Sequence, residues 1–250
     1  MSQQKRVGLT ALGAVLSPLE GSGPRTEAVV QRLSAAISLG VMVDGQQLPS
    51  ETVLADQLGV STMTLREALA VLRQQGIVHT KRGRGGGSFI HGSAGVLEDT
   101  SLTRLQRMSI RELRDLGDEH FAITGTAVVF ATRRGLPEDM ERLRGLIDRL
   151  RESVDRVSAR RIDSRFYIEM AVCAQSTRLT RAEVGLQVEL SDLLWLPQLA
   201  LVPAYEAVAH HDLMDAIEGE DDARARELAQ SHIEARIRRL VALRLELRDR

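Results

Sequence analysis

The stretch GQQLPSETVLADQLGVSTMTLREALAVLRQQGIVHTKRGRGGGSFI, residues 45–90, decides the fold that this sequence predicts. Its first part predicts a short helix. Ser50 can accept a hydrogen bond from an unpaired backbone N–H of the first turn, and the apolar residues within 54–58 form a stripe that can be buried. Gly59 can end this helix, because glycine adopts the left-handed conformation at no steric cost.

A second helix is predicted directly after that turn. Ser61 can cap it, and Gly76 can stop it. The apolar residues at helical spacing between these two positions are Leu65, Leu69 and Leu72. Two short helices joined by a tight turn predict a helix-turn-helix. In such a motif the first turns of the second helix enter the major groove, while its apolar side rests on the domain core.

The end of the stretch predicts a β-hairpin. Residues 77–79 and 88–90 have the composition of strands, and they flank the segment KRGRGGG, residues 81–87. Glycines let a backbone approach a phosphate closely, and the cations attract it, so this tip predicts a wing that contacts DNA. Read alone, residues 83–87 could also be a linker or a phosphate loop, although the Gly-Lys-Ser/Thr ending of a nucleotide site is missing.

Together these residues resemble the winged helix of GntR-type bacterial transcription factors. The pattern comprises Gly45-x-x-Leu48-Pro49-Ser50-Glu51, Leu54-Ala55, Val60-Ser61, Leu65-Arg66-Glu67-Ala68-Leu69, Leu72, Gly76 and Gly83-Arg84-Gly85. The resemblance implies contacts with double-stranded DNA from the helix opening, the recognition helix and the wing. The residues expected to make them are Ser50, Ser61, Thr62, Thr64, Arg66, Lys81, Arg82, Arg84 and Gly85. The family usually carries basic residues where this chain has Thr52 and Thr62, which predicts an altered sequence preference.

The composition fits a protein of two ordinary domains. The chain has 250 residues, of which 43% are apolar, and no apolar run reaches the ~20 residues of a membrane helix. A single cysteine, Cys173, allows no intramolecular disulfide. We therefore expect a cytoplasmic protein without a membrane partner. We expect a mobile arm at residues 1–23 and a DNA-binding domain at 24–92.

The charge is unevenly distributed along the chain. The net charge is −1 overall, but residues 1–92 carry 9 basic against 6 acidic side chains, or +3, and the remainder carries 24 against 28, or −4. A modestly basic head on an acidic body predicts limited nonspecific affinity for DNA, so binding should depend on direct contacts and on dimer avidity.

The second half of the chain predicts an antiparallel all-α bundle. Residues 93–109 are polar and irregular, which fits a linker. Apolar residues then recur at helical spacing through 110–250, without a strand signal. Prolines and a glycine divide this region into about six or seven helices. The breaks lie at Pro137, Pro197, Pro203 and Gly219.

A few polar residues of the bundle occupy positions expected to face inward. Asp163 and Tyr167 are four residues apart and share a helix face, while His210 and His232 lie on apolar stripes of two other helices. A lone histidine in such a place is usually a hydrogen-bonded core residue. Two histidines with an aspartate favour a divalent metal, because imidazole and carboxylate suit zinc, nickel, manganese or iron.

Residues 104–245 resemble the ligand-binding bundle of the FadR-like GntR branch, called FCD. Its Asp-x-x-Phe-His motif appears as Asp163-Ser164-Arg165-Phe166-Tyr167, and its later histidine pair as His210 and His232. The resemblance implies that Asp163, His210 and His232 bind a metal, with Tyr167 in place of a fourth histidine. It also implies an effector pocket, which we expect to include His120, Phe121, Thr124, Arg165 and Tyr167. Phe121 stands near the position of an effector-clamping arginine, which predicts a less acidic or larger ligand.

The function predicted from these features is a ligand-responsive transcriptional regulator, a repressor that binds an inverted repeat as a homodimer. A non-sensing structural DNA-binding protein is an alternative, although the acidic body argues against DNA packaging. A metal-dependent hydrolase fused to a DNA-binding head is another, with His120 or Glu119 as the base. An enzyme has no need of the winged head, so we predict that the chain is not an enzyme.

Overall fold

The computed structural model describes residues 25–38, 42, 45–81, 83, 86–91 and 94–248. The chain divides into two compact units, one ending at Thr100 and the other beginning at Ser101. The arm expected at residues 1–23 lies outside the described residues, as do Arg82, Arg84 and Gly85 of the expected wing.

The first unit contains the predicted helix-turn-helix. Helix α2 (Arg25–Ser38) precedes α3 (Glu51–Leu58) and α4 (Thr62–Gln74). Ser50 caps α3, since its Oγ accepts a hydrogen bond from the N–H of Val53 at 3.4 Å. Gly59 ends α3 in the left-handed conformation with φ 65°. The turn between α3 and α4 is therefore built as the sequence predicted.

One apolar core holds the described helices of this unit together. Helix α2 packs against α4, and α3 also contacts α4. The fully buried side chains include Val29, Leu33, Leu54, Leu58, Leu65, Leu69, Leu72, Ile77 and Ile90. Each large apolar side chain moved out of water contributes about 1.5–3 kcal/mol before entropic costs. The predicted apolar stripe of α4 thus fixes which side of the helix remains available to DNA.

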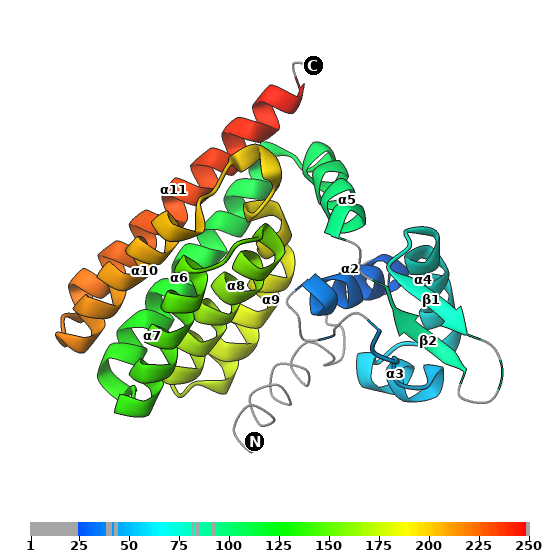
Figure 1. Ribbon diagram of the computed structural model, residues 1–250, viewed down its shortest axis with the longest axis horizontal. Helices are drawn as coiled ribbons and strands as arrows, with labels where there is room; N and C mark the ends of the chain where they lie inside the picture. The colour runs from blue at the N-terminus through cyan, green and yellow to red at the C-terminus, as the bar shows by residue number, and fades with distance from the viewer. Residues whose placement is uncertain are drawn as a thin grey trace. The chain divides into compact units, whose positions relative to one another are not determined.

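The hairpin of strands β1 (Val78–Lys81) and β2 (Gly87–Ile90) follows α4 (Figure 1). The strands are antiparallel, with Val78 opposite Ile90 and Lys81 opposite Gly87. Gln47 adds an isolated bridge to β2, and its side chain donates a hydrogen bond to the carbonyl oxygen of Gly86 at 3.0 Å. The segment before α3 thereby ties strand β2 of the wing to the helix-turn-helix.

The second unit is the predicted helical bundle (Figure 1). Its long helices are α6 (Ile110–Arg134), α7 (Pro137–Arg151), α8 (Arg156–Cys173), α9 (Thr177–Leu194), α10 (Pro203–Glu218) and α11 (Asp222–Arg248), with a 3₁₀ turn η1 (Pro197–Leu199). Helix α6 packs against α11, and α7 packs against both α8 and α10. None of the helices among the described residues is long and apolar enough to span a membrane.

The irregular linker expected at residues 93–109 is instead mostly helical. Helix α5 (Ala94–Arg107) occupies it, and Leu105 on that helix is fully buried in the bundle core. Leu102, one turn earlier, packs against the same core. Two leucines three residues apart are enough to dock a polar helix, but they are too few to produce a clear helical period in the sequence.

Candidate functional site

The N-terminal turn of α4 presents polar side chains to solvent in the first unit. Ser61 caps α4, because its Oγ accepts a hydrogen bond from the N–H of Thr64 at 3.0 Å. The hydroxyl of Thr64 lies 2.9 Å from the same Oγ, which fixes both side chains. Thr62 is exposed, and so is Ser50 at the opening of α3. A helix N-terminus with unpaired N–H groups and hydroxyls is suited to contact DNA phosphates.

Arg66 is held by an ion pair that sequence reasoning did not predict. Its Nε donates to Oε2 of Glu51 on α3 at 2.6 Å, and the Arg66 side chain is still 69% exposed. The hydrogen bond from Arg66 to Glu51 raises the pKa of this guanidinium. Among the residues that the structure describes, only Nε of Arg66 is paired, so the ion pair aims the guanidinium and leaves its two terminal nitrogens available for a base edge or phosphate.

The wing is described only in part. Lys81 ends β1 with an exposed side chain, opposite Gly87 of β2. The wing cations Arg82 and Arg84 lie outside the described residues, and so does Gly85. The contacts predicted for them remain predictions.

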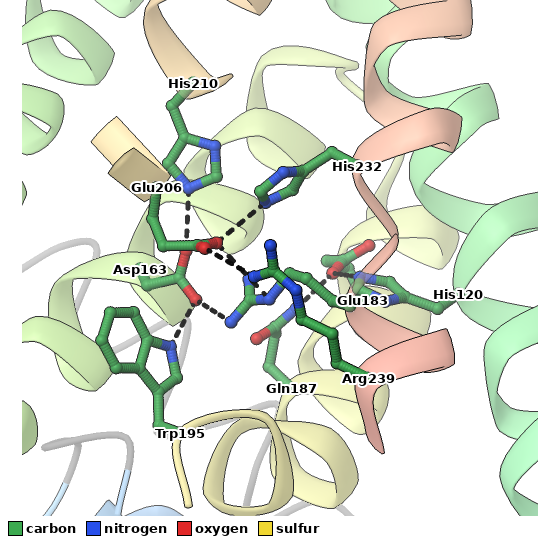
Figure 2. A network of polar contacts seen from close by, with 10 residues as sticks. His120, Asp163, Glu183, Gln187, Trp195, Glu206, His210, His232 and Arg239 are labelled. Carbon is green, nitrogen blue, oxygen red and sulfur yellow. Dashed lines mark hydrogen bonds and ion pairs between the residues drawn. The ribbon is translucent and has the colours of Figure 1, made fainter. Parts of the chain in front are cut away.

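In the second unit, Asp163 on α8 is the centre of a buried polar network (Figure 2). Its Oδ2 accepts hydrogen bonds from the indole Nε1 of Trp195 at 2.7 Å and from Nη2 of Arg236 at 2.8 Å. Its Oδ1 lies 2.8 Å from Nε2 of His210 on α10. Burial alone would raise the pKa of Asp163, but the Arg236 guanidinium and the His210 hydrogen bond hold it well below its usual value.

A second carboxylate, Glu206 on α10, continues the network toward α11. Its Oε2 lies 3.2 Å from Nε2 of His232 and 3.6 Å from Nε of Arg236, and its Oε1 lies 3.9 Å from Nη1 of Arg239 (Figure 2). Burial favours the neutral form of His232 and lowers its pKa. Despite its burial, Glu206 keeps a lowered pKa, because His232 and Arg236 stabilise its charge.

A smaller polar cluster lies between α6 and α9. Glu183 is fully buried and accepts hydrogen bonds from the Thr124 hydroxyl at 2.7 Å and the Gln187 amide at 2.9 Å. Nε2 of His120 lies 3.7 Å from the same carboxylate. The ring of Tyr167 contacts His120 edge-on, with centroids 5.4 Å apart, and it contacts His210 at 5.3 Å. Tyr167 therefore lies between the two clusters, and burial raises the pKa of its phenol.

The structure brings together most of the bundle residues singled out from the sequence. Asp163, His210 and His232 belong to one network, and Tyr167 contacts it through His210. His120 and Thr124 join the Glu183 cluster, and Phe121 packs at the edge of the apolar core. Arg165, expected to supply a charge to the pocket, instead pairs with Glu169 one turn along α8 at 3.0 Å.

The sequence pattern did not indicate that Arg236, Glu206 and Trp195 belong to this network. The position of Arg236, four residues after His232 on the same helix face, was a signal for the first of them. Charged residues are rarely fully buried unless paired, so the sequence alone favoured a solvent-exposed arginine.

In the observed arrangement the residues do not fit a divalent ion. Within the described part of the chain, no group of three or more His, Cys, Asp or Glu side chains is arranged to hold a metal. His210 and Asp163 are hydrogen-bonded to each other, and Asp163 also accepts from Trp195 and Arg236. The metal site expected from the sequence therefore remains a prediction, and this geometry does not favour it.

Comparison with known proteins connects both units to transcriptional control. A family model described as bacterial regulatory proteins of the gntR family matches residues 25–87, and an FCD domain model matches residues 115–235. The HTH-type transcriptional regulator RmpR of Mycobacterium gastri is 39% identical over 227 residues, which are 89% of this chain and 82% of that protein. The Glc operon transcriptional activator of Escherichia coli K12 is 35% identical over 46% of this chain and 45% of its own.

A solved structure shows the same fold at low identity. A GntR family transcriptional regulator from Pseudomonas syringae pv. tomato aligns with a TM-score of 0.50 and 16% identity, over 100% of this chain and 98% of that one. The gntR family model and the relatives named above describe transcriptional regulators and not enzymes, as the sequence predicted.

Proposed function

Because this chain belongs to the GntR family of transcriptional regulators and carries an FCD domain, we propose that it is a ligand-responsive repressor that binds an inverted-repeat operator as a homodimer. The observation that carries the proposal is the exposed first turn of α4, with Ser61 and Thr62 in the open and Arg66 held by Glu51. A regulator of this kind acts on the chromosome, so its place is the bacterial cytoplasm.

The size of the recognition surface supports a dimer. One helix N-terminus and one wing read only a few base pairs, and two-fold symmetry doubles that readout without a second kind of module. The acidic body supplies little nonspecific attraction to DNA, so a monomer would bind weakly. An operator of two inverted half-sites is the matching DNA.

The buried polar network supports control by a small organic molecule. Polar and ionisable groups from α8, α10 and α11 converge inside the bundle, and convergent polar groups in a mostly apolar interior are typical of ligand sites. Phe121 and Thr124 stand where the family resemblance leads us to expect charged groups, so the proposed effector is less acidic or larger than a small hydroxy acid.

DNA binding and repression need separate tests. Fluorescence anisotropy with a duplex from the region upstream of the gene, against a scrambled duplex of equal length, tests specific binding, and light scattering during size exclusion gives the oligomeric state. We expect a dimer and a preference of at least about a thousandfold for the operator. A monomer with equal affinity for both duplexes would contradict the proposal.

A reporter assay in cells distinguishes repression from activation. Because one relative is named as an activator of its operon, a promoter–reporter fusion should be compared with and without the gene. Higher expression without the gene supports repression, and lower expression contradicts it. Thermal-shift screening of metabolites linked to the flanking genes would then identify a ligand, since binding to the folded state raises the apparent Tm.

A further inference from the structure

Arg236 lies where the sequence pattern would place a metal ion. It projects from α11, is 3% exposed, and lies 2.8 Å from Asp163 through Nη2 and 3.6 Å from Glu206 through Nε. Its guanidinium also faces the ring of Trp195, with the central carbon 5.8 Å from the ring centroid. A permanent cation is thus fixed between Asp163, the one carboxylate of the predicted metal site, and Glu206.

We infer that Arg236 replaces the divalent ion as the positive centre of this bundle, which makes the interior a metal-independent site. The inference goes beyond the proposed function, because it concerns what holds the site together whether or not an effector is known. The pattern of Asp163, His210 and His232 predicts a metal site, whereas we infer an arginine-centred site without a metal.

The hydrogen bonds of Asp163 leave Nε2 of His210 without the free lone pair that a metal ion would need. A carboxylate that accepts from Arg236 and Trp195 is an acceptor only, so Nε2 of His210, at 2.8 Å, must carry a proton and donate it. Metal coordination requires a free lone pair on that nitrogen. The same bonds that satisfy Asp163 therefore occupy the His210 atom that would bind the ion.

Repulsion between a divalent ion and the Arg236 guanidinium also disfavours metal binding. A divalent ion bound to Asp163 would lie within a few ångströms of the Arg236 guanidinium, in an interior where little water screens the two charges. Tyr167 offers no compensation, because its buried phenol is a poor ligand unless it loses its proton. Nη1 of Arg236 has no hydrogen-bond partner among the described residues, so this donor remains for an acceptor on a bound molecule.

Metal content of the full-length protein is the first test. The protein should be purified without an immobilised-metal column and analysed by elemental mass spectrometry. Zinc, nickel and manganese should then be titrated separately into the chelator-treated protein while its Tm is followed. We expect far less than one metal per chain and no rise in Tm. About one metal per chain, lost in His210→Ala, would overturn the inference.

A pair of double variants tests the role of Arg236 directly. Tyr167→His with Arg236→Gln supplies a fourth ligand and removes the cation. Tyr167→His with Arg239→Gln supplies the same ligand and removes an arginine whose side chain is 58% exposed. We expect the first variant to bind zinc at least roughly tenfold more tightly than the second, in competition with a chelator.

The outcomes of this comparison are distinct. Equal zinc affinity in the two double variants would overturn the assignment of Arg236 as the group that excludes the metal. A folded Tyr167→His, Arg236→Gln variant that binds no zinc would overturn it as well. If the variant with Arg236→Gln does not fold, the metal content of the unmodified protein still tests the inference, because about one metal per chain would overturn it. None of these measurements uses DNA or an effector, so their result is independent of the proposed repressor function.

Discussion

Replacing Asp163 with asparagine should destabilise the helical bundle by about 3–5 kcal/mol. The side chain is 3% exposed and meets three donors, from His210, Trp195 and Arg236. Asparagine has nearly the same shape, so the packing changes little. The loss comes from leaving the guanidinium of Arg236 buried without its closest counter-charge, and from turning an amide donor toward groups that already donate.

The magnitude follows from the burial of the pair and not from the number of its bonds. Moving both charges out of water costs about as much as their attraction returns, so the intact pair adds little net stability, whereas removing one partner exposes the whole desolvation cost of the other. Glu206 offsets part of this cost, since its Oε2 lies 3.6 Å from Nε of Arg236. We therefore expect a value toward the lower end of the range.

Urea unfolding followed by far-ultraviolet circular dichroism measures the effect in the full chain. The control is Asp148→Asn on α7, which removes the same charge from an exposed ion pair with Arg151 and should change stability by no more than about 1 kcal/mol. If the stability of Asp163→Asn falls within about 1 kcal/mol of that of the unmodified protein, Asp163 and Arg236 are not a dry ion pair.

Three further predictions concern other parts of the chain. Arg66→Ala should weaken operator binding by roughly ten- to a hundredfold in anisotropy titrations, while Arg73→Ala in the last turn of α4 should have a smaller effect; equal losses would remove the special role of Arg66. Gly117→Ala should lower the free energy of unfolding by up to about 1 kcal/mol in urea titrations, because the strain of a methyl group 3.0 Å from the buried, branched side chain of Ile237 outweighs the roughly 1 kcal/mol of helix propensity that alanine adds; a stabilised variant would contradict this. Burial raises the pKa of Cys173 to about 12, so the folded protein should react with Ellman's reagent far more slowly at pH 8 than in urea, and equal rates would show an accessible thiol.

Local chemistry made the first unit predictable from the sequence. Ser50 and Ser61 are caps, Gly59 is a left-handed terminator, and the leucine spacing of α4 fixes its buried side. Each of these features acts within a few residues, so the sequence contains them completely. The ion pair between Glu51 and Arg66 joins two helices, and no local rule predicts which exposed charges meet.

The bundle interior was less predictable because its contacts join distant helices. The period of α8 indicates that Asp163 and Tyr167 share a face, but it does not indicate that Arg236, 73 residues later, meets that face. Glu206 and Arg236 are also charged residues on long helices, where solvent exposure is the ordinary expectation. Only the packing of α8, α10 and α11 shows that Arg236 pairs with Asp163 and Glu206 inside the bundle.

The hydrogen bond from Trp195 to Asp163 has an optical consequence. The chain contains a single tryptophan, and its indole nitrogen is bonded to the central carboxylate of the buried network. Indole emission responds to nearby charge and to the strength of this bond, so a molecule that enters the network, or a rearrangement of Arg236, should change the intensity or wavelength of the intrinsic fluorescence. The protein thus contains its own spectroscopic reporter at the place where an effector is proposed to bind, and unlabelled protein is sufficient for a titration.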